Sequence, residues 1–354
     1  MSIARRLSSK QVTFWHMEEP PISGAAQDIR VAVIGRFRFI EPYPYTFVTT
    51  AKGRWCDREL VEVFLSEFRH WKREDIVERI KSGAITVNGK MIPQDYVIRS
   101  LDKISHTILR RECPVINDPI EKIGETDDFV AYLKPASVPL HASGGFHYNA
   151  MINRIPGRYR IVHRLDRVTS GIIVLAKSLD AARSFQVMLN THTVKKTYIA
   201  RVIGVFPEGE VVCDEPIDFT PENRQVMRVT PGGKESKTVF HRVSTNGKES
   251  IVECSPITGR THQIRVHLSH LGFPISNDPV YGGKPEKFAA ADKAALMEAE
   301  KRGLYPPDTA INPSDDAFMS IYLHSFSYES DVFDFRAPMP PWTELGSASK
   351  CSVE

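Results

Sequence analysis

The chain has 354 residues, of which 42% are hydrophobic and 25% are charged. These values are ordinary for a soluble globular protein, and the length predicts about two domains with sizeable cores. The net charge of +3 is too small to identify a nucleic-acid partner by itself, and no apolar run in the sequence approaches the length of a membrane span.

The cysteines and the N-terminal composition bear on the cellular compartment. The five cysteines are scattered without a C-x-x-C pair, which disfavours a zinc or redox site and favours a reducing compartment. They are Cys56, Cys113, Cys213, Cys254 and Cys351. The opening MSIARRLSSK is basic and weakly resembles a mitochondrial presequence, although a disordered basic tail has the same composition. We expect a soluble cytoplasmic or nuclear protein, with mitochondrial import as the alternative.

Residues 1–54 mix proline, arginine and aromatic residues without sustained periodicity, so they are predicted to form an extended arm. The segments DRELVEVFLSEF and REDIVERIKSG then place apolar residues at helical spacing, and the second segment ends at Gly83. AITVNGKMI follows, with the Asn88 and Gly89 pair typical of a two-residue hairpin turn. Residues 55–110 are therefore predicted to form a small module of two helices and a hairpin.

This module resembles the S4-type RNA-binding domain in its run IKSGAITVNGKMI, which has that family's order of helix end, strand and NG turn. The basic and aromatic stretch between the two helices supplies candidate phosphate contacts, namely Arg69, Lys72 and Arg73. A solvated charge run has the same composition, and a lid or a dimerisation element remains an alternative for the whole module.

The elements predicted for residues 111–340 are mostly strands. One strand ends at Lys134, IIVLAKS indicates a buried strand, and LDAARSFQVMLN has helical spacing. KKTYIARVIGV indicates a further strand, TVFHRVSTNGKESIVECSPI a hairpin, and THQIRVHLSHLG a short amphipathic helix. This mixture predicts an α+β fold with a largely antiparallel, mixed sheet. Residues 284–316 are expected to be a helical insertion with a loop, and residues 341–354 a frayed tail.

One short stretch, HRLDRVTSG, places the carboxylate of Asp166 between Arg164 and Arg167 just before a buried strand. Most such clusters are ion pairs on a surface loop. A strand immediately after the loop can instead hold the carboxylate in a cleft on a rigid base, as a catalytic group requires. His163 is expected to be a hydrogen-bonded structural histidine rather than a general base.

Three strings, HRLDRVTSG, KKTYIA and TGRTHQIRVHLSHLGFPISNDPVYG, together resemble the pseudouridine synthases of the RluA type, and KPASVPLH resembles that family's first motif. The resemblance covers roughly residues 55–335 in motif order. It implies that Asp166 is the catalytic aspartate, that Tyr198 packs against the uracil, and that Arg265 is the basic partner of the aspartate. The expected RNA-binding residues of this region are Arg164, Arg167, Lys134, Arg260 and His262.

The implied reaction explains why these residue types are needed. Turning uridine into pseudouridine breaks the N1–C1′ bond, rotates the base and rejoins it through C5, with no redox change and no added group, so no metal and no cofactor is expected. A carboxylate can add covalently to the ribose or the base, or take a proton from the sugar. It must stay ionised in a largely dry pocket, where a cation at Arg265 favours its charged form. The base must first leave its stack, and the ring of Tyr198 recovers part of that cost.

The substrate is predicted from the resemblance alone. The YPY…KGRW block resembles the eukaryotic branch of these synthases that includes fungal enzymes modifying uridine 32 in the tRNA anticodon loop. We therefore expect a monomeric enzyme acting on tRNA, with no membrane partner. Messenger RNA, ribosomal RNA and mitochondrial tRNA remain alternatives within the same activity.

Four other interpretations of these motifs are weaker. The histidines of THQIRVHLSH, which are His262, His267 and His270, lack metal-ligand spacing. PGGKESKT lacks the G-K-[ST] ending of a phosphate loop. A glycosidase needs two partnered carboxylates, and one carboxylate stands in a catalytic-looking motif. A non-catalytic S4-type RNA-binding protein is the main alternative of another class, although it would tolerate the loss of all three predicted catalytic residues.

Overall fold

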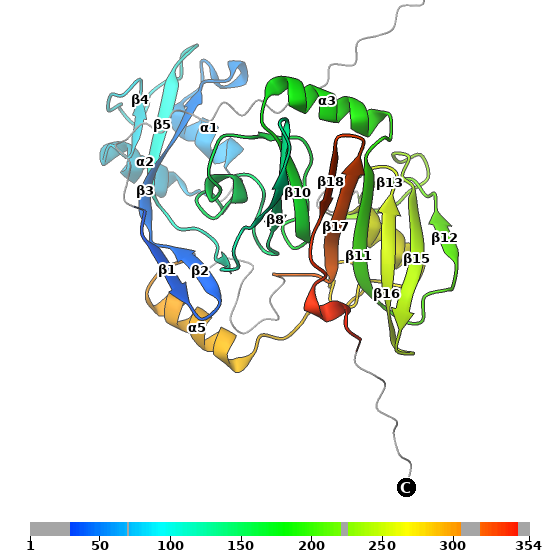
Figure 1. Ribbon diagram of the computed structural model, residues 1–354. Helices are drawn as coiled ribbons and strands as arrows, with labels where there is room; N and C mark the ends of the chain where they lie inside the picture. Colours follow the sequence, from blue (N-terminus) through cyan, green and yellow to red (C-terminus); the bar gives the residue numbers. More distant parts are fainter. Residues whose placement is uncertain (1–28, 69–70, 221–225, 306–318, 346–354) are drawn as a thin grey trace, which may run out of the picture. The chain divides into compact units, whose positions relative to one another are not determined.

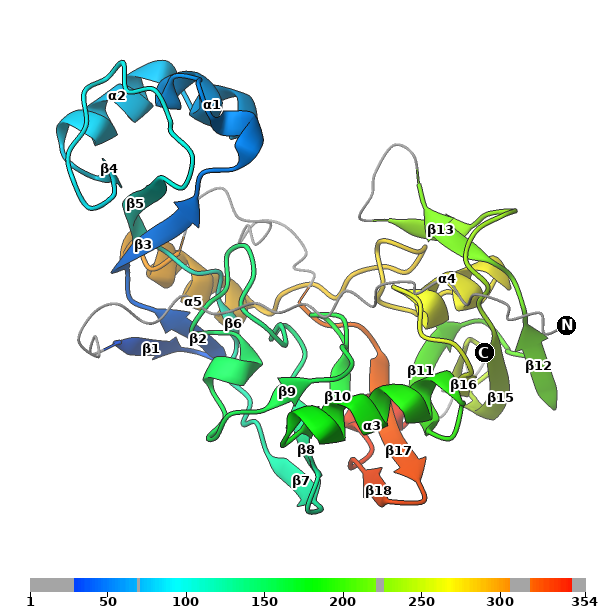
Figure 2. The ribbon, with the colours of Figure 1, turned by 90° about the horizontal axis from the view of Figure 1, so that it is seen from above.

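The computed structural model describes residues 29–68, 71–220, 226–305 and 319–345. The described residues separate into two compact units (Figures 1 and 2), one formed by residues 43–110 and the other by residues 30–42 together with residues 111–345. Across these ranges, no helix has the length and apolar character needed to cross a bilayer.

The first unit contains two helices, a 3₁₀ turn and a three-stranded antiparallel sheet in the order β3-β5-β4. Its elements are β3 (Tyr43–Thr50), η1 (Gly53–Trp55), α1 (Leu60–Glu67), α2 (Arg73–Lys81), β4 (Ile85–Val87) and β5 (Lys103–Arg110). The apolar positions that predicted the two helices, including Leu60, Phe64 and Ile76, pack with Trp55 in one core. The predicted helices are confirmed, while the assignment of the unit to the S4 type remains a prediction.

The predicted turn at Asn88 and Gly89 is present, but the hairpin is shorter than expected. Both residues have positive φ angles of 50° and 74°, and Val87 and Lys90 exchange backbone hydrogen bonds across them. The chain then leaves the sheet, so β4 pairs with β5 instead of with the residues after the turn. Pairing between distant segments cannot be deduced from the local turn signal.

The second unit is built on a ten-stranded sheet with the order β12-β15-β16-β11-β17-β10-β8-β7, in which β9 also pairs with β10 and β18 with β17. The strands of the second unit, within this sheet and outside it, are β1 (Val31–Ile34), β2 (Phe37–Ile40), β6 (Val115–Ile116), β7 (Lys122–Glu125), β8 (Phe129–Lys134), β9 (Arg160–Ile161), β10 (Ser170–Ala176), β11 (Lys195–Ile203), β12 (Glu210–Cys213), β13 (Ile217–Phe219), β14 (Met227–Val229), β15 (Thr238–Thr245), β16 (Glu249–Pro256), β17 (Leu323–Ser330) and β18 (Phe333–Arg336). Its helices are α3 (Leu179–Asn190), α4 (Gln263–His270) and α5 (Ala290–Lys301), with 3₁₀ turns η2 (Met151–Asn153) and η3 (Pro341–Thr343). All neighbours are antiparallel except β10 and β17, which confirms the α+β prediction.

After Ser170, strand β10 is apolar because both faces of the sheet are covered at this point. Ile173 and Leu175 belong to the main core, while Ile172 and Val174 pack beneath α3 with Phe185. A strand covered on both faces has no reason to alternate polar and apolar residues. The apolar residues that follow HRLDRVTSG therefore reflect the central place of β10 in the sheet. Figure 2 shows this strand beside α3.

Residues 31–50 differ from the expected extended arm, because they form the strands β1, β2 and β3. Phe37 and Phe39 are fully buried in a separate cluster with Leu296 of α5 and Tyr305. The helix expected in the insertion is thus present as α5, and it covers strands that lie about 260 residues earlier in the chain. The prolines and arginines of this segment do not suggest strands, and only β1 has its partner nearby, since β2 also pairs with β6 and β3 pairs with β5.

Candidate active site

The backbone around Asp166 holds its carboxylate in place. Asp166 lies in the loop between β9 and β10, and its carbonyl oxygen accepts a hydrogen bond from the backbone N–H of Thr169 at 3.1 Å. Gly171, at the start of β10, has a φ of 114° and pairs with Ser325 of the parallel strand β17. A Cβ atom at Gly171 would overlap the backbone of Ser325. Glycine is therefore required where the loop that carries Asp166 enters the sheet.

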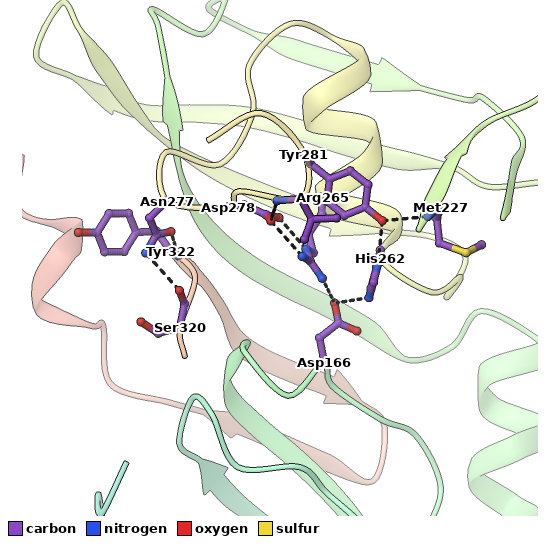
Figure 3. Close-up of polar contacts among 10 residues, drawn as sticks. Asp166, Met227, His262, Arg265, Asn277, Asp278, Tyr281, Ser320 and Tyr322 are labelled. Carbon is purple, nitrogen blue, oxygen red and sulfur yellow. Dashed lines mark hydrogen bonds and ion pairs between the residues drawn. The ribbon is translucent and has the colours of Figure 1, made fainter. Parts of the chain in front are cut away.

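The charged centre of the site joins three side chains from distant segments (Figure 3). Nη1 of Arg265, in α4, donates to Oδ2 of Asp166 at 3.0 Å. The same guanidinium donates through Nε and Nη2 to both carboxylate oxygens of Asp278, at 2.7 and 3.0 Å. Asp278 is fully buried, whereas 19% of the Asp166 side chain is exposed. The bidentate pair thus fixes Arg265, and its remaining nitrogen faces the more accessible carboxylate.

Arg265 remains a cation in this position. Burial alone lowers the pKa of Arg265, but its hydrogen bonds and its attraction to Asp278 and Asp166 outweigh burial and raise that pKa. The guanidinium also lies over the ring of Tyr281, 4.9 Å from the ring centre. Arg265 therefore places a permanent positive charge next to the carboxylate of Asp166.

His262 and Tyr281 form a second contact with the carboxylate. His262 precedes α4 in a left-handed conformation, with φ 56° and ψ 17°. Its Nε2 lies 3.6 Å from Oδ2 of Asp166, and its Nδ1 lies 2.7 Å from the hydroxyl of Tyr281. Burial is the main cause that lowers the pKa of His262, so the ring is neutral near pH 7. His262 therefore contacts Asp166 at the wall of the cleft, and its predicted contact with RNA stays a prediction.

Tyr198 reaches the same cleft from β11. Its hydroxyl lies 3.0 Å from that of Tyr328, and burial raises the pKa of Tyr198. The backbone N–H of Val174 donates to Nε2 of His163, so His163 presents its Nδ1 proton to the hydroxyl of Tyr328. Burial lowers the pKa of His163 to about 3. His163 is a neutral, doubly hydrogen-bonded residue, as the sequence predicts.

A cleft of about 310 Å³ brings the three predicted catalytic residues together. Asp166, Tyr198 and Arg265 all line it. Two of the predicted RNA-binding arginines, Arg164 and Arg260, also line the cleft and are exposed. A pocket of this size fits one extruded nucleotide base with part of its sugar, and exposed cations at its border can meet backbone phosphates.

Lys134 is a correction to the sequence prediction. It is fully buried, and its Nζ donates to the carbonyl oxygens of Pro135, Val138 and Arg167 at 2.9, 2.9 and 3.1 Å. Burial, with a contribution from the charge of Arg167, lowers the pKa of Lys134 to about 7. An ammonium group with all three protons donated inside the protein cannot bind RNA; it ties together the loop that follows β8 and the loop that carries Asp166.

The remaining predicted RNA contacts are dispersed. Arg167 is half-buried, and its guanidinium lies 5.8 Å from the ring centre of Phe146. Lys72 and Arg73 are exposed on the first unit, where Arg73 is paired with Glu62. Arg69 lies outside the described residues. Each of these residues retains its RNA-binding assignment as a prediction only.

Sequence reasoning missed several groups at the site. Asp278 and Tyr281 lie in NDPVYG, which was quoted as part of a motif without a role for either residue. Asn277 fixes this loop, because its Oδ1 accepts from the backbone N–H of Tyr322 at 2.7 Å and its Nδ2 donates to the carbonyl of Ser320 at 3.4 Å (Figure 3). An Asn-Asp pair next to proline signals a turn, but the sequence does not show which groups the two side chains will contact after folding.

The described residues contain no group of three or more His, Cys, Asp or Glu side chains arranged to hold a metal ion. His267, one of the three histidines considered as ligands, is buried and lies 2.9 Å from the hydroxyl of Thr238 and 3.0 Å from the carbonyl of Glu215. Its ring is thus engaged in hydrogen bonds within the fold.

Comparisons with known proteins find relatives that align with most of this chain. Residues 128–270 match the RNA pseudouridylate synthase family. RNA pseudouridine synthase 7 of Oryza sativa subsp. japonica is 40% identical over 360 aligned residues, covering 88% of this chain and 92% of its own length. The mitochondrial tRNA pseudouridine(32) synthase of Saccharomyces cerevisiae is 39% identical over 262 residues, covering 72% of this chain and 57% of its own.

Among solved structures, human RNA pseudouridylate synthase domain containing 1 is similar at 25% identity and a TM-score of 0.45, covering 63% of this chain and 83% of that chain. The match to the family covers HRLD, KKTYIA and most of the THQIR helix, and the rice protein aligns with nearly the whole chain. The chain therefore belongs to the RNA pseudouridine synthase family, and it is an isomerase that converts uridine to pseudouridine in RNA.

Proposed function

We propose that this synthase modifies a uridine in the anticodon loop of tRNA, at position 32, with Asp166 as its catalytic residue. The contact between Asp166 and Arg265 inside the cleft carries the proposal for the site. The name of the yeast relative supports the proposal for the substrate. A loop uridine is also less costly to extrude than a paired one, since it has no base pair to break.

Three residues of the cleft have defined parts in the proposed reaction. Asp166 adds to the ribose or the base, or accepts a proton from the sugar, so that cleavage of the N1–C1′ bond is divided into easier steps. Arg265 holds a positive charge and a hydrogen-bond donor against Oδ2 of the carboxylate while substrate displaces water from the cleft. Tyr198 stacks on the extruded uracil and holds it while the base turns to present C5 to C1′.

The proposed RNA contacts outside the cleft are made by cations. Arg164 and Arg260 meet phosphates next to the extruded nucleotide, and Lys72 and Arg73 extend the binding surface on the first unit. We further propose that the protein acts as a monomer without a bound metal. A mitochondrial location is one proposal, based on the name of the yeast relative and the basic N-terminal composition; the cytoplasm and the nucleus are the alternatives.

The test is base-resolved pseudouridine mapping of unmodified tRNA transcripts incubated with wild-type protein or with Asp166→Asn. We expect wild type to create pseudouridine at position 32 and Asp166→Asn to create none, with RNA affinity changed by less than about tenfold because phosphate contacts dominate binding. The matched control is Asp214→Asn, an exposed carboxylate paired with Lys237, which should keep full activity.

Two results would contradict parts of the proposal separately. Activity retained by Asp166→Asn would remove Asp166 from the chemistry. Pseudouridine formed by wild type in mRNA or rRNA fragments but not in tRNA would overturn the substrate and leave the catalytic residue unaffected.

A further inference from the structure

A line of polar groups connects Asp166 to the backbone of the β13–β14 hairpin (Figure 3). The backbone N–H of Met227 in β14 donates to the hydroxyl oxygen of Tyr281 at 3.1 Å. That hydroxyl lies 2.7 Å from Nδ1 of His262, and Nε2 of the same ring faces Oδ2 of Asp166 at 3.6 Å. Three side chains and one amide thus lie in series.

The two ends of this line determine the direction of its hydrogen bonds. A backbone amide can only donate, so Met227 occupies a lone pair of the Tyr281 oxygen. An ionised carboxylate can only accept, so Asp166 favours a proton on the facing Nε2 of His262. A neutral imidazole with its proton on Nε2 has an acceptor at Nδ1, and the Tyr281 hydroxyl lies close enough, at 2.7 Å, to donate its proton to this nitrogen.

We propose that Tyr281 holds His262 in the Nε2–H tautomer, so that His262 presents a hydrogen-bond donor to Asp166; Tyr281 and His262 are positioning residues for the isomerisation. This inference rests on the catalytic role proposed above for Asp166. It assigns to His262 a role different from the RNA contact that the sequence suggested.

Burial and packing support the arrangement. Tyr281 is 8% exposed and packs with Ile217 and Val266, beneath the β13–β14 hairpin. Burial raises the pKa of Tyr281 to about 12, so the hydroxyl keeps its proton near neutral pH. The lowered pKa of His262 keeps its ring neutral, as a single tautomer requires. The charged groups that face His262 are Asp166, Arg265, Asp278 and Arg164.

The arrangement has a consequence for the carboxylate. Because Arg265 and His262 both approach Oδ2 of Asp166, we expect Oδ1 to be the oxygen that meets the nucleotide. The 3.6 Å separation is longer than a hydrogen bond. Catalytic hydrogen bonds commonly shorten when substrate fills the site, and we expect this one to close when a nucleotide enters the cleft.

The first test reads the tautomer directly, without RNA. In protein labelled with ¹⁵N-histidine, long-range ¹H–¹⁵N correlations at pH 7.5 distinguish protonated from unprotonated ring nitrogens, and the signals of His262 are those lost in His262→Gln. Wild type should show a proton on Nε2 and none on Nδ1. Tyr281→Phe should give a mixture of both tautomers, while Tyr305→Phe, which removes a buried hydroxyl outside the cleft, should leave the pattern unchanged.

The second test measures turnover on a tRNA transcript. Tyr281→Phe and His262→Leu should each lower kcat by about tenfold, the loss expected when one hydrogen bond to a charged group is removed, with KM nearly unchanged. His262→Gln keeps an N–H donor near the position of Nε2 and should regain most of the kcat. Adding Tyr281→Phe to His262→Gln should have little further effect, because Tyr281 acts through the histidine.

Several outcomes would overturn the proposal. A proton on Nδ1 of His262 in wild type would reverse the hydrogen bonds. An unchanged tautomer in Tyr281→Phe, or a loss of kcat in His262→Gln as large as in His262→Leu, would remove the positioning role. The proposed role of Asp166 is judged separately by Asp166→Asn, and the tautomer is read in the absence of substrate, so the two proposals can fail independently.

Discussion

At the scale of single residues, Arg265 is shared by two carboxylates of unequal exposure. Asp278 is fully buried and holds the guanidinium by two hydrogen bonds, whereas Asp166 is partly open to the cleft and receives one. A buried ion pair contributes little net stability, but removing one partner leaves an uncompensated buried charge. The pair with Asp278 is therefore best understood as the support that aims Arg265 at Asp166.

Stability and catalysis can be separated at Arg265. Arg265→Met should destabilise the protein by about 3–5 kcal/mol in urea unfolding, because Asp278 loses its partner. The double variant Arg265→Met with Asp278→Leu should regain most of that stability, since apolar groups then replace both members of the buried pair. The double variant should remain nearly inactive, because Asp166 still lacks its cation. Arg183→Met removes an exposed ion pair and serves as the control. High activity in the double variant would show that Asp166 does not need Arg265.

At the scale of elements, the parallel contact between β10 and β17 determines where the loop that carries Asp166 enters the sheet. The contact is short, with Ser170 opposite His324 and Gly171 opposite Ser325. The hydroxyl of Ser170 and Nδ1 of His324 are 2.8 Å apart. Close approach at Gly171 thus sets the position of a loop whose carboxylate must meet α4, an element about 100 residues later in the chain.

A side chain at Gly171 should break this contact. Gly171→Ala would place Cβ against the backbone of Ser325 at a positive φ, so the two strands would have to separate. We expect a fall in the thermal unfolding midpoint of about 8 °C or more, as for a severe backbone clash costing several kcal/mol. Gly259→Ala is the matched control for stability, because its added Cβ meets no atom within 4 Å. Equal midpoints for the two variants would show that the strands can adjust.

At the scale of the whole molecule, the chain is organised in two units with separate cores. The first unit packs its helices and three strands around Trp55, Leu60 and Ile76. The second unit includes residues 30–42, which lie before the first unit in sequence and carry the buried Phe37 and Phe39. A truncation at residue 110 would therefore remove part of the catalytic unit's core along with the first unit.

Excision is the appropriate way to test the first unit. Tyr43 and Arg110 pair directly at the ends of β3 and β5, so a short glycine linker can join residues 42 and 111 after residues 43–110 are removed. If the first unit binds RNA, KM for tRNA should rise by about tenfold or more while kcat stays similar, because its phosphate contacts are lost. Thermal unfolding of the excised protein serves as the folding control. An unchanged KM with a folded catalytic unit would reject the RNA-binding role of the first unit.

Much of the local structure could be predicted from the sequence. The helices α1, α2, α3 and α4, the strand β10 and the turn of the β15–β16 hairpin all follow from periodicity, caps and NG pairs, which act within a few residues. The strands β1 and β2 could not be predicted, because their character depends on burial against α5. Strand β3 could not be predicted because its partner, β5, lies more than 50 residues later in the chain. The same limit explains Lys134, whose sequence context suggests a surface cation but whose partners are three backbone carbonyls from folded loops.

The candidate site also has one part that the sequence predicts and another part that only the tertiary structure determines. The motif resemblance placed Asp166, Tyr198 and Arg265 in one reaction, and the structure brings all three to one cleft. The supporting groups were decided by tertiary structure alone, since Asp278, Tyr281 and Met227 acquire their roles only when the loop after α4 and the β13–β14 hairpin meet at Arg265 and His262. Sequence determines which chemical groups exist and how the local chain bends. Folding determines which groups are buried next to one another, and this proximity sets their charges and the direction of their hydrogen bonds.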